Sequence, residues 1–154
     1  MASNTLTGRV ATMADFDKLA PLLQNNCQRM QFDWAKYEFG TRQILSNPDY
    51  GFIILAEKED GSAAGFLSLT FEWSDWRNGV FFWMQGLELD AACDQASVIS
   101  TLKAALELHK TTLDFQCCGI RLCTPKVVHH EVETAIQAFD LKPSHYYIYH
   151  IDTA

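Results

Sequence analysis

The sequence predicts an α/β fold of the α+β type, in which a mixed, mostly antiparallel sheet carries helices on both faces. Apolar residues recur at helical spacing up to Leu45 and again from Ala96, whereas the stretch between them has the two-residue period of strands. The later helical stripe stands between two strand-like runs, which is typical of a parallel crossover. At 154 residues we expect one domain spanning 1–154, long enough to bury a hydrophobic core.

A short apolar segment and two helices are expected at the start of the chain. The segment is Gly8–Ala11, and after it Thr12 and Asp15 have the spacing of a capping box. One helical face then carries Phe16, Leu19, Ala20, Leu23 and Cys27. Asn25 and Asn26 indicate fraying near the end of this first helix. The second helix is expected over Trp34–Leu45, because Pro48 disfavours helical geometry in the residue before it.

The middle of the chain predicts three antiparallel strands. They cover Gly51–Ala56, Ala64–Phe71 and Val80–Leu89, separated by polar turns at Glu59–Gly61 and Ser74–Gly79. Runs of this length with short polar connections favour hairpin pairing, so each strand is expected beside the next.

Four further elements are expected after the third long strand. A helical stripe predicts a long helix over Ala96–Asp114, packed on the sheet. Ile120–Thr124 then predicts a strand parallel to Val80–Leu89. A short helix over Glu131–Phe139 and a final strand over Tyr146–Ile151 complete the chain.

Charge and composition exclude several classes of partner. A formal charge of −7 without a basic run opposes binding to nucleic acid. No apolar run approaches the roughly 20 residues of a membrane span, and the start of the chain lacks a signal-peptide core. An odd count of five cysteines favours reduced thiols. We therefore expect a cytoplasmic protein with neither a membrane nor a nucleic acid as partner.

Several segments resemble the GNAT superfamily of acetyltransferases across nearly the whole chain. Arg9–Asp15 resembles its opening, Gly51–Glu57, Gly65–Leu69 and Leu87–Leu89 resemble its second, third and fourth strands, and Pro143–Tyr149 resembles its close. The resemblance implies the GNAT fold and an acetyl-CoA-dependent N-acetyltransferase acting on a small amine or a peptide amine.

The resemblance also implies where acetyl-CoA binds. In that family an Arg/Gln-x-x-Gly-x-Gly/Ala loop after the fourth strand holds the pyrophosphate with backbone amides and a helix N-terminus. Here Asp94 stands at the arginine position, and Ser97 and Ile99 stand at the glycine positions. The residues that the resemblance assigns to the cofactor are Leu87, Leu89, Gln95, Ala96, Ser97 and Val98.

Two carboxylates near this helix start allow opposite interpretations. Asp90 and Asp94 are good helix caps, but each also repels a pyrophosphate. The alternative to an enzyme is therefore a degenerate GNAT-fold binding or interaction module that does not transfer acyl groups.

Acyl transfer to an amine requires a general base and a general acid. The family's usual base position on the fourth strand holds Gln85, which leaves Glu72 and Glu88 as candidate bases. Phe139 stands at the position of the family's acidic tyrosine. Tyr147, or its neighbours Tyr146 and Tyr149, could supply a phenol instead, although strand tyrosines often cover a sheet edge or an interface.

Two other groups of residues could carry a function: a set of histidines and cysteines, and a cluster of aromatic residues. His129 and His130, with Cys117, Cys118 and Cys123 before them, lack the spacing of a zinc site, so no metal is expected. Six aromatic residues lie in or beside the turn at Ser74–Gly79: Phe71, Trp73, Trp76, Phe81, Phe82 and Trp83. They are more than one core face requires, so the surplus predicts either helix cover, a hydrophobic acceptor pocket or the surface of a homodimer.

Overall fold

The computed structural model describes residues 5–124 and 130–153. Its sheet has five strands in chain order: β1 (Thr7–Val10), β2 (Gly51–Glu57), β3 (Ala63–Ser74), β4 (Gly79–Leu89) and β5 (Cys117–Leu122). Strands β1 to β4 pair antiparallel, and β5 pairs parallel to β4. The predicted mixed, mostly antiparallel sheet is confirmed.

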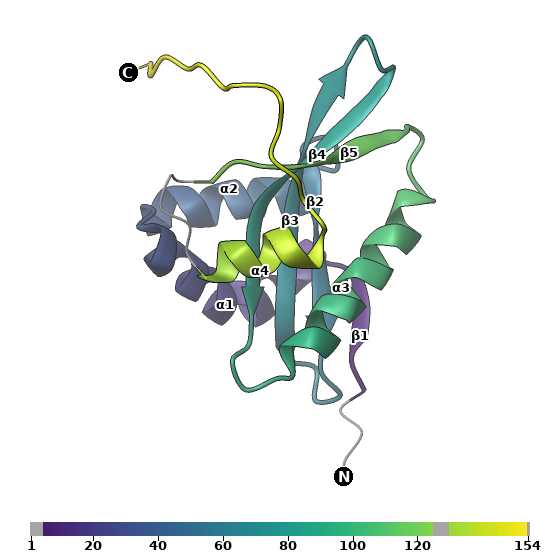
Figure 1. Cartoon of the computed structure of the whole chain (residues 1–154). Helices are drawn as coiled ribbons and strands as arrows, with labels where there is room; N and C mark the ends of the chain where they lie inside the picture. Colours follow the sequence, from purple (N-terminus) through teal and green to yellow (C-terminus); the bar gives the residue numbers. More distant parts are fainter. Residues whose placement is uncertain (1–4, 125–129, 154) are drawn as a thin grey trace.

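Helices cover both faces of this sheet, as predicted. They are α1 (Phe16–Met30), α2 (Trp34–Ser46), α3 (Gln95–Lys110) and α4 (His130–Ala138), with a 3-10 turn, η1 (Met13–Asp15), before α1. In Figure 1, α1 and α2 lie behind the sheet, whereas α3 and α4 lie in front of it. None of the helices in the described ranges is long and apolar enough to span a bilayer.

The alternation of the strands sorts apolar side chains into two layers. Phe66 packs with Leu19 and Leu23 on the side of α1, whereas the next residue, Leu67, packs with Leu102 on the side of α3. All five side chains are almost fully buried. Burial of one such side chain contributes about 1.5–3 kcal/mol, so the two layers hold the helices on the sheet.

The start of the first helix follows the predicted capping box. The Thr12 amide donates to Asp15 Oδ2 at 2.8 Å, and η1 precedes the α-helix proper. The expected fraying at Asn25 and Asn26 is wrong, because α1 continues to Met30 and Asn26 is buried. There the Tyr37 hydroxyl donates to Asn26 Oδ1 at 3.0 Å, which satisfies the asparagine from a second helix.

The predicted final strand over Tyr146–Ile151 is wrong. The described residues 141–153 contain no strand, and the side chains of Tyr147 and Tyr149 are 85% and 90% exposed. In Figure 1 this segment, drawn in yellow, leaves α4 and runs past the sheet. Alternating apolar residues favour a strand only where a sheet edge accepts their backbone hydrogen bonds, and the segment does not pair with β5.

Candidate functional site

The pairing of β4 with β5 ends halfway along β4. It runs from Val80 and Cys117 to Met84 and Leu122, while the remaining part of β4 continues beside β3. The register between β3 and β4 shifts at this point, and Gln85 is the extra residue of the bulge. Within the described chain, the last five residues of β4 therefore have a strand neighbour on one side only.

Helix α3 follows β4 directly and begins with a carboxylate over its N-terminus. Asp94 is the N-cap, and its Oδ2 accepts from the Ser97 amide at 3.0 Å and from the Ser97 hydroxyl at 2.6 Å. The Val98 amide donates to the Asp94 carbonyl at 3.1 Å, which is the first helical hydrogen bond. The amides of Gln95 and Ala96 precede that bond, so they point out of the helix end.

The other predicted carboxylate at this end is directed elsewhere. Asp90 Oδ2 lies 2.5 Å from Lys58 Nζ, and its Oδ1 accepts from the Ala92 amide at 3.0 Å. The Lys58 ammonium lowers the pKa of Asp90, and the hydrogen bonds from Ser97 lower the pKa of Asp94. Both carboxylates are anionic at neutral pH. Asp90 forms an ion pair with Lys58, whereas Asp94 caps the N-terminus of α3 with its charge.

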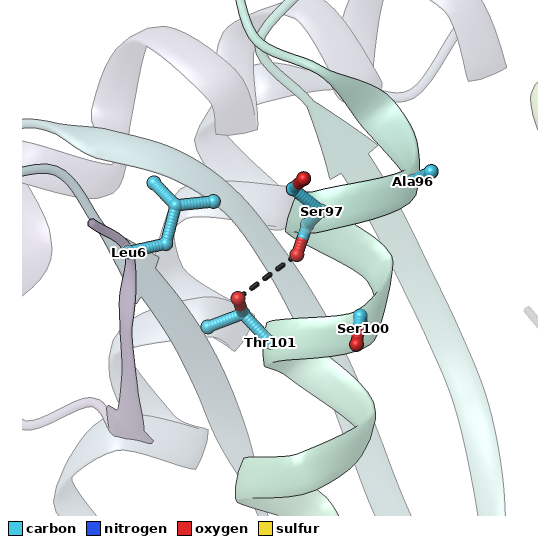
Figure 2. A pocket seen from close by; sticks show the side chains of 5 residues that line it. All are labelled: Leu6, Ala96, Ser97, Ser100 and Thr101. Atoms are coloured by element: carbon cyan, nitrogen blue, oxygen red, sulfur yellow. Dashed lines mark hydrogen bonds between the residues drawn. The ribbon is translucent and has the colours of Figure 1, made fainter. Parts of the chain in front are cut away.

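A cavity of about 440 Å³, called here the α3 cavity, borders the first turns of α3. Its lining consists of Leu6, Ala96, Ser97, Ser100 and Thr101. Figure 2 shows Ser97 and Thr101 on the side of α3 that faces Leu6, with the Thr101 hydroxyl bonded to the Ser97 carbonyl at 2.9 Å.

The six predicted cofactor residues therefore occupy different environments. Ala96 and Ser97 line the α3 cavity, and Gln95 is exposed on the same turn. Leu87, Leu89 and Val98 direct their side chains into the layer beneath α3, so only their backbone could face a ligand.

Glu88, one of the two candidate bases, lies on the opposite face in a buried ion pair. Arg29 Nη1 donates to Glu88 Oε1 at 3.1 Å, and Arg29 Nη2 donates to the other carboxylate oxygen. The Glu88 residue is only 7% exposed. Nearby, burial raises the pKa of the Tyr37 phenol. The geometry gives Glu88 a role in joining α1 to β4.

A second and larger cavity, of about 750 Å³, borders the paired part of β4 and β5 and is called here the aromatic cavity. The turn between β3 and β4, the strands β4 and β5, and the segment after α4 form its walls. Its lining includes Trp76, Arg77, Phe81, Trp83, Arg121 and Tyr147.

Glu72, the other candidate base, is tied to two of these residues. Arg121 Nη1 donates to Glu72 Oε1 at 2.9 Å, and Trp83 Nε1 donates to Glu72 Oε2. The Glu72 side chain remains 43% exposed. Tyr147 lines the cavity from the C-terminal segment, and Glu72 is connected to the lining through Trp83 and Arg121, whereas Glu88 bonds to Arg29 on the other face.

The six aromatic residues around the turn between β3 and β4 lie in different environments. Phe71 and Phe82 pack in the layer beneath α3, whereas Trp76, Phe81 and Trp83 line the aromatic cavity. The Trp73 residue is 59% exposed.

Sequence reasoning missed Arg77 and Arg121. The Arg121 guanidinium carbon lies 3.5 Å from the centroid of the Phe81 ring, and that of Arg77 lies 5.2 Å from it. A charged residue between the apolar Ile120 and Leu122 was the available signal, because such a side chain in a strand requires a partner.

Within the described ranges, no group of three or more His, Cys, Asp or Glu side chains could hold a metal ion. His129, one of the two histidines weighed as ligands, lies outside those ranges. The described cysteines, Cys27 included, are free thiols.

No family model matches the chain, and no curated protein matches its sequence. Solved structures with the same fold are nevertheless numerous. A possible acetyltransferase from Clostridium difficile 630 superposes with a TM-score of 0.79 at 21% identity, over 97% of this chain and 98% of that one. The resemblance to the GNAT superfamily is confirmed at the level of the fold.

Two other neighbours have more specific names. Aminoglycoside N-acetyltransferase AAC(6')-Iy in complex with CoA has a TM-score of 0.74 at 14% identity, covering 99% of this chain and 97% of that one. Ribosomal-protein-alanine N-acetyltransferase from Brucella melitensis biovar Abortus 2308 has a TM-score of 0.71 at 14% identity, covering 97% and 100%.

Proposed function

We propose that this protein transfers an acetyl group from acetyl-CoA to a primary amine of a small molecule or peptide. One observation carries the proposal: the pairing of β4 and β5 ends at Met84 and Leu122, and Trp83 and Arg121, which hold the Glu72 carboxylate, line one cavity with Tyr147. The helix N-terminus that follows β4 supplies backbone donors for an anion. A neighbour of the same fold, solved with CoA, supports this choice of cofactor.

The residues present fit a pyrophosphate through the backbone rather than through a glycine loop. The Gln95 and Ala96 amides precede the first helical hydrogen bond, and the N-terminus of a helix of 16 residues adds a positive dipole end. The Ser97 amide contributes less, because Asp94 already accepts its hydrogen bond.

When bound, acetyl-CoA supplies an activated thioester that an amine can open. Glu72 accepts, at Oε1 or Oε2, the proton that the ammonium must lose, and Trp83 and Arg121 hold that carboxylate at the cavity. Tyr147, which lines the same cavity as Trp83 and Arg121, would hold at Oη the proton that a general acid must supply. The apolar rings of Phe81 and Trp83 exclude water around the amine.

A second candidate function is a binding module that does not transfer acyl groups. The position of Asp94 favours it, since this carboxylate occupies the Ser97 amide and repels a diphosphate. Both functions use the same fold, so they differ first in whether acetyl-CoA binds.

Calorimetry and thermal melting with acetyl-CoA and with desulfo-CoA test the proposal. At 100 times its Kd, a ligand stabilises the folded state by about 2.7 kcal/mol, which melting detects readily. Acetyl-CoA should then be consumed in the presence of amines, with desulfo-CoA as an inhibitor. If millimolar acetyl-CoA gave neither heat nor a melting shift, the transferase function would be wrong and the binding module would be the remaining candidate.

One variant tests the predicted backbone donors directly. Gln95→Pro removes an amide at the first helical position, where proline is well tolerated and where the preceding Asp94 is already extended. It should weaken binding of acetyl-CoA about tenfold, as expected for loss of one hydrogen bond to a charged group. Gln95→Ala, which keeps the amide, is the control and should bind like the wild type.

A further inference from the structure

We propose that the acceptor amine also carries a carboxylate or a similar anionic group, which Arg77 and Arg121 bind in the aromatic cavity. That the ligand is an acceptor amine rests on the proposed transferase function, whereas the anion site rests on the residues of the cavity alone. The anion site would narrow the acceptor to amines that also carry a negative group.

The charge of the aromatic cavity is opposite to that of the protein. The chain has a formal charge of −7. The lining of the cavity nevertheless contains Arg77, Arg121 and Lys142, and none of its lining residues is an aspartate or glutamate. A cavity lined by cations and apolar rings concentrates positive potential, because its walls screen the charges less than water does.

The two arginines retain donors for a ligand. Arg121 donates one hydrogen bond to Glu72, whereas a guanidinium has five N–H groups. Arg77 makes no ion pair with any residue of the described ranges, and its guanidinium instead lies 5.2 Å and 5.6 Å from the rings of Phe81 and Trp76. By contrast, Lys142 pairs with Asp140 at the surface, so it contributes little to the field of the cavity.

Both guanidinium groups converge on one ring. Their central carbons lie 3.5 Å and 5.2 Å from the centroid of Phe81, and both arginines line the aromatic cavity with that ring. Each guanidinium is a planar donor that can bind a carboxylate with two hydrogen bonds. Glu72, bonded to Arg121, would then receive the ammonium end of a ligand whose carboxylate Arg77 holds. The geometry suits a short amino acid with an apolar or aromatic body, whereas a polycation such as an aminoglycoside would meet two like charges.

A matched pair of probes separates charge from shape: 4-(aminomethyl)benzoate and its neutral amide, 4-(aminomethyl)benzamide. Calorimetry with the full chain and no acetyl-CoA measures their binding without any need for turnover. We expect the benzoate to bind about tenfold or more tightly than the benzamide, as one charge-assisted pair implies. Equal affinities, or a preference for the benzamide, would overturn the inference.

Variants assign the preference to these side chains. Arg77→Gln and Arg121→Gln should each reduce the ratio of the two affinities to near one. Arg42→Gln is the control, because Arg42 also stacks on a ring, 3.5 Å from the Phe16 centroid, and also pairs with a glutamate, Glu38, but lies outside the cavity. A preference that survives Arg77→Gln in a folded protein would contradict the assignment.

The same probes distinguish failure of this inference from failure of the proposed function. If the benzoate binds selectively but is never acetylated in the presence of acetyl-CoA, the transferase function is wrong and the anion site stands. If both probes are acetylated with equal kcat/KM, the transferase function stands and the anionic acceptor is wrong.

Discussion

Asp94 Oδ2 accepts hydrogen bonds from both the amide and the hydroxyl of Ser97, at 3.0 and 2.6 Å. This single oxygen therefore occupies the helix N-terminus at which the proposed function places a phosphate. The protein supplies its own anion there, and a bound ligand must share the helix end with it or displace it.

Replacing this carboxylate should affect stability and cofactor binding in opposite directions. Asp94→Ala removes the cap of α3 and should lower the melting temperature. It also removes a negative charge beside the pyrophosphate, so acetyl-CoA should bind about fivefold more tightly, as the Coulomb energy of a close exposed pair implies. Calorimetry and thermal melting measure the two effects separately.

Asp33→Ala is the matched control for that variant. Asp33 caps α2 in the same way, accepting from the Lys36 amide at 3.0 Å. It should lower the melting temperature and leave the affinity for acetyl-CoA unchanged. Weaker cofactor binding by a folded Asp94→Ala protein would show that Asp94 assists the ligand instead of opposing it.

Glu72 is expected to act in turnover and to matter little for stability. Glu72→Gln keeps an oxygen for Trp83 Nε1 but cannot accept a proton, so kcat should fall about 10²–10⁴-fold. Its exposed pair with Arg121 contributes at most about 1 kcal/mol. Steady-state kinetics checks this, with Glu107→Gln, in an exposed pair with Lys110 on α3, as the control. Unchanged kcat in Glu72→Gln would remove Glu72 as the base.

Glu88 is expected to matter for stability and not for turnover. Glu88→Gln removes the carboxylate charge that the half-buried Arg29 meets on β4, which should cost about 1.5–3 kcal/mol of unfolding free energy in urea titration. Glu38→Gln, in the exposed pair with Arg42, should cost less than about 0.5 kcal/mol. If Glu88→Gln kept its stability but lost kcat, the role of base would pass from Glu72 to Glu88.

Tyr147 is expected to supply the general acid. Tyr147→Phe removes the proton of the phenol and should lower kcat about 10²-fold in steady-state kinetics. Tyr149→Phe is the control, because Tyr149 is as exposed but does not line the aromatic cavity. Equal rates for the two variants would exclude Tyr147 as the acid.

Acid should weaken the fold partly through Asp15. This carboxylate accepts from Arg9 at 2.7 and 2.8 Å and from the Thr12 amide, and these bonds hold its pKa well below the ordinary value of 3.8. Because the folded pKa is the lower one, the stabilisation is complete above about pH 4 and is lost as the pH falls toward the folded pKa.

Comparison with Asp15→Asn isolates this contribution. The variant should be about 2 kcal/mol less stable than the wild type at pH 6, and the difference should shrink as the pH falls from 4 to 2. Urea unfolding across that range measures it. A difference that stayed constant with pH would show that Asp15 has the same pKa in both states.

The parts of the fold that follow from local pattern could be predicted from the sequence. The boundaries of β2 and β4 and the start of α2 agree with the apolar periods and polar turns to within one residue, and the Thr12–Asp15 cap formed as its spacing implies. These features depend on residues that are close in the chain, so a single sequence contains the information.

The candidate site depended on residues that are far apart. Glu88 and Arg29 are 59 positions apart, and Glu72 and Arg121 are 49 apart, so nothing in the local pattern shows that one carboxylate is buried while the other bonds to a residue of a cavity. The wrong strand at Tyr146–Ile151 has the same cause, because a strand forms only where a sheet edge accepts it.

The sequence by itself determined the order of helices and strands as far as α4, the helices on both faces of the sheet and the negative charge of the chain, since these follow from composition and period. Only the tertiary structure decided which carboxylate bonds to residues of the aromatic cavity, which amide Asp94 occupies, and that two arginines lie near the Phe81 ring. Charges act through space, and the folding of the chain sets the distances between them.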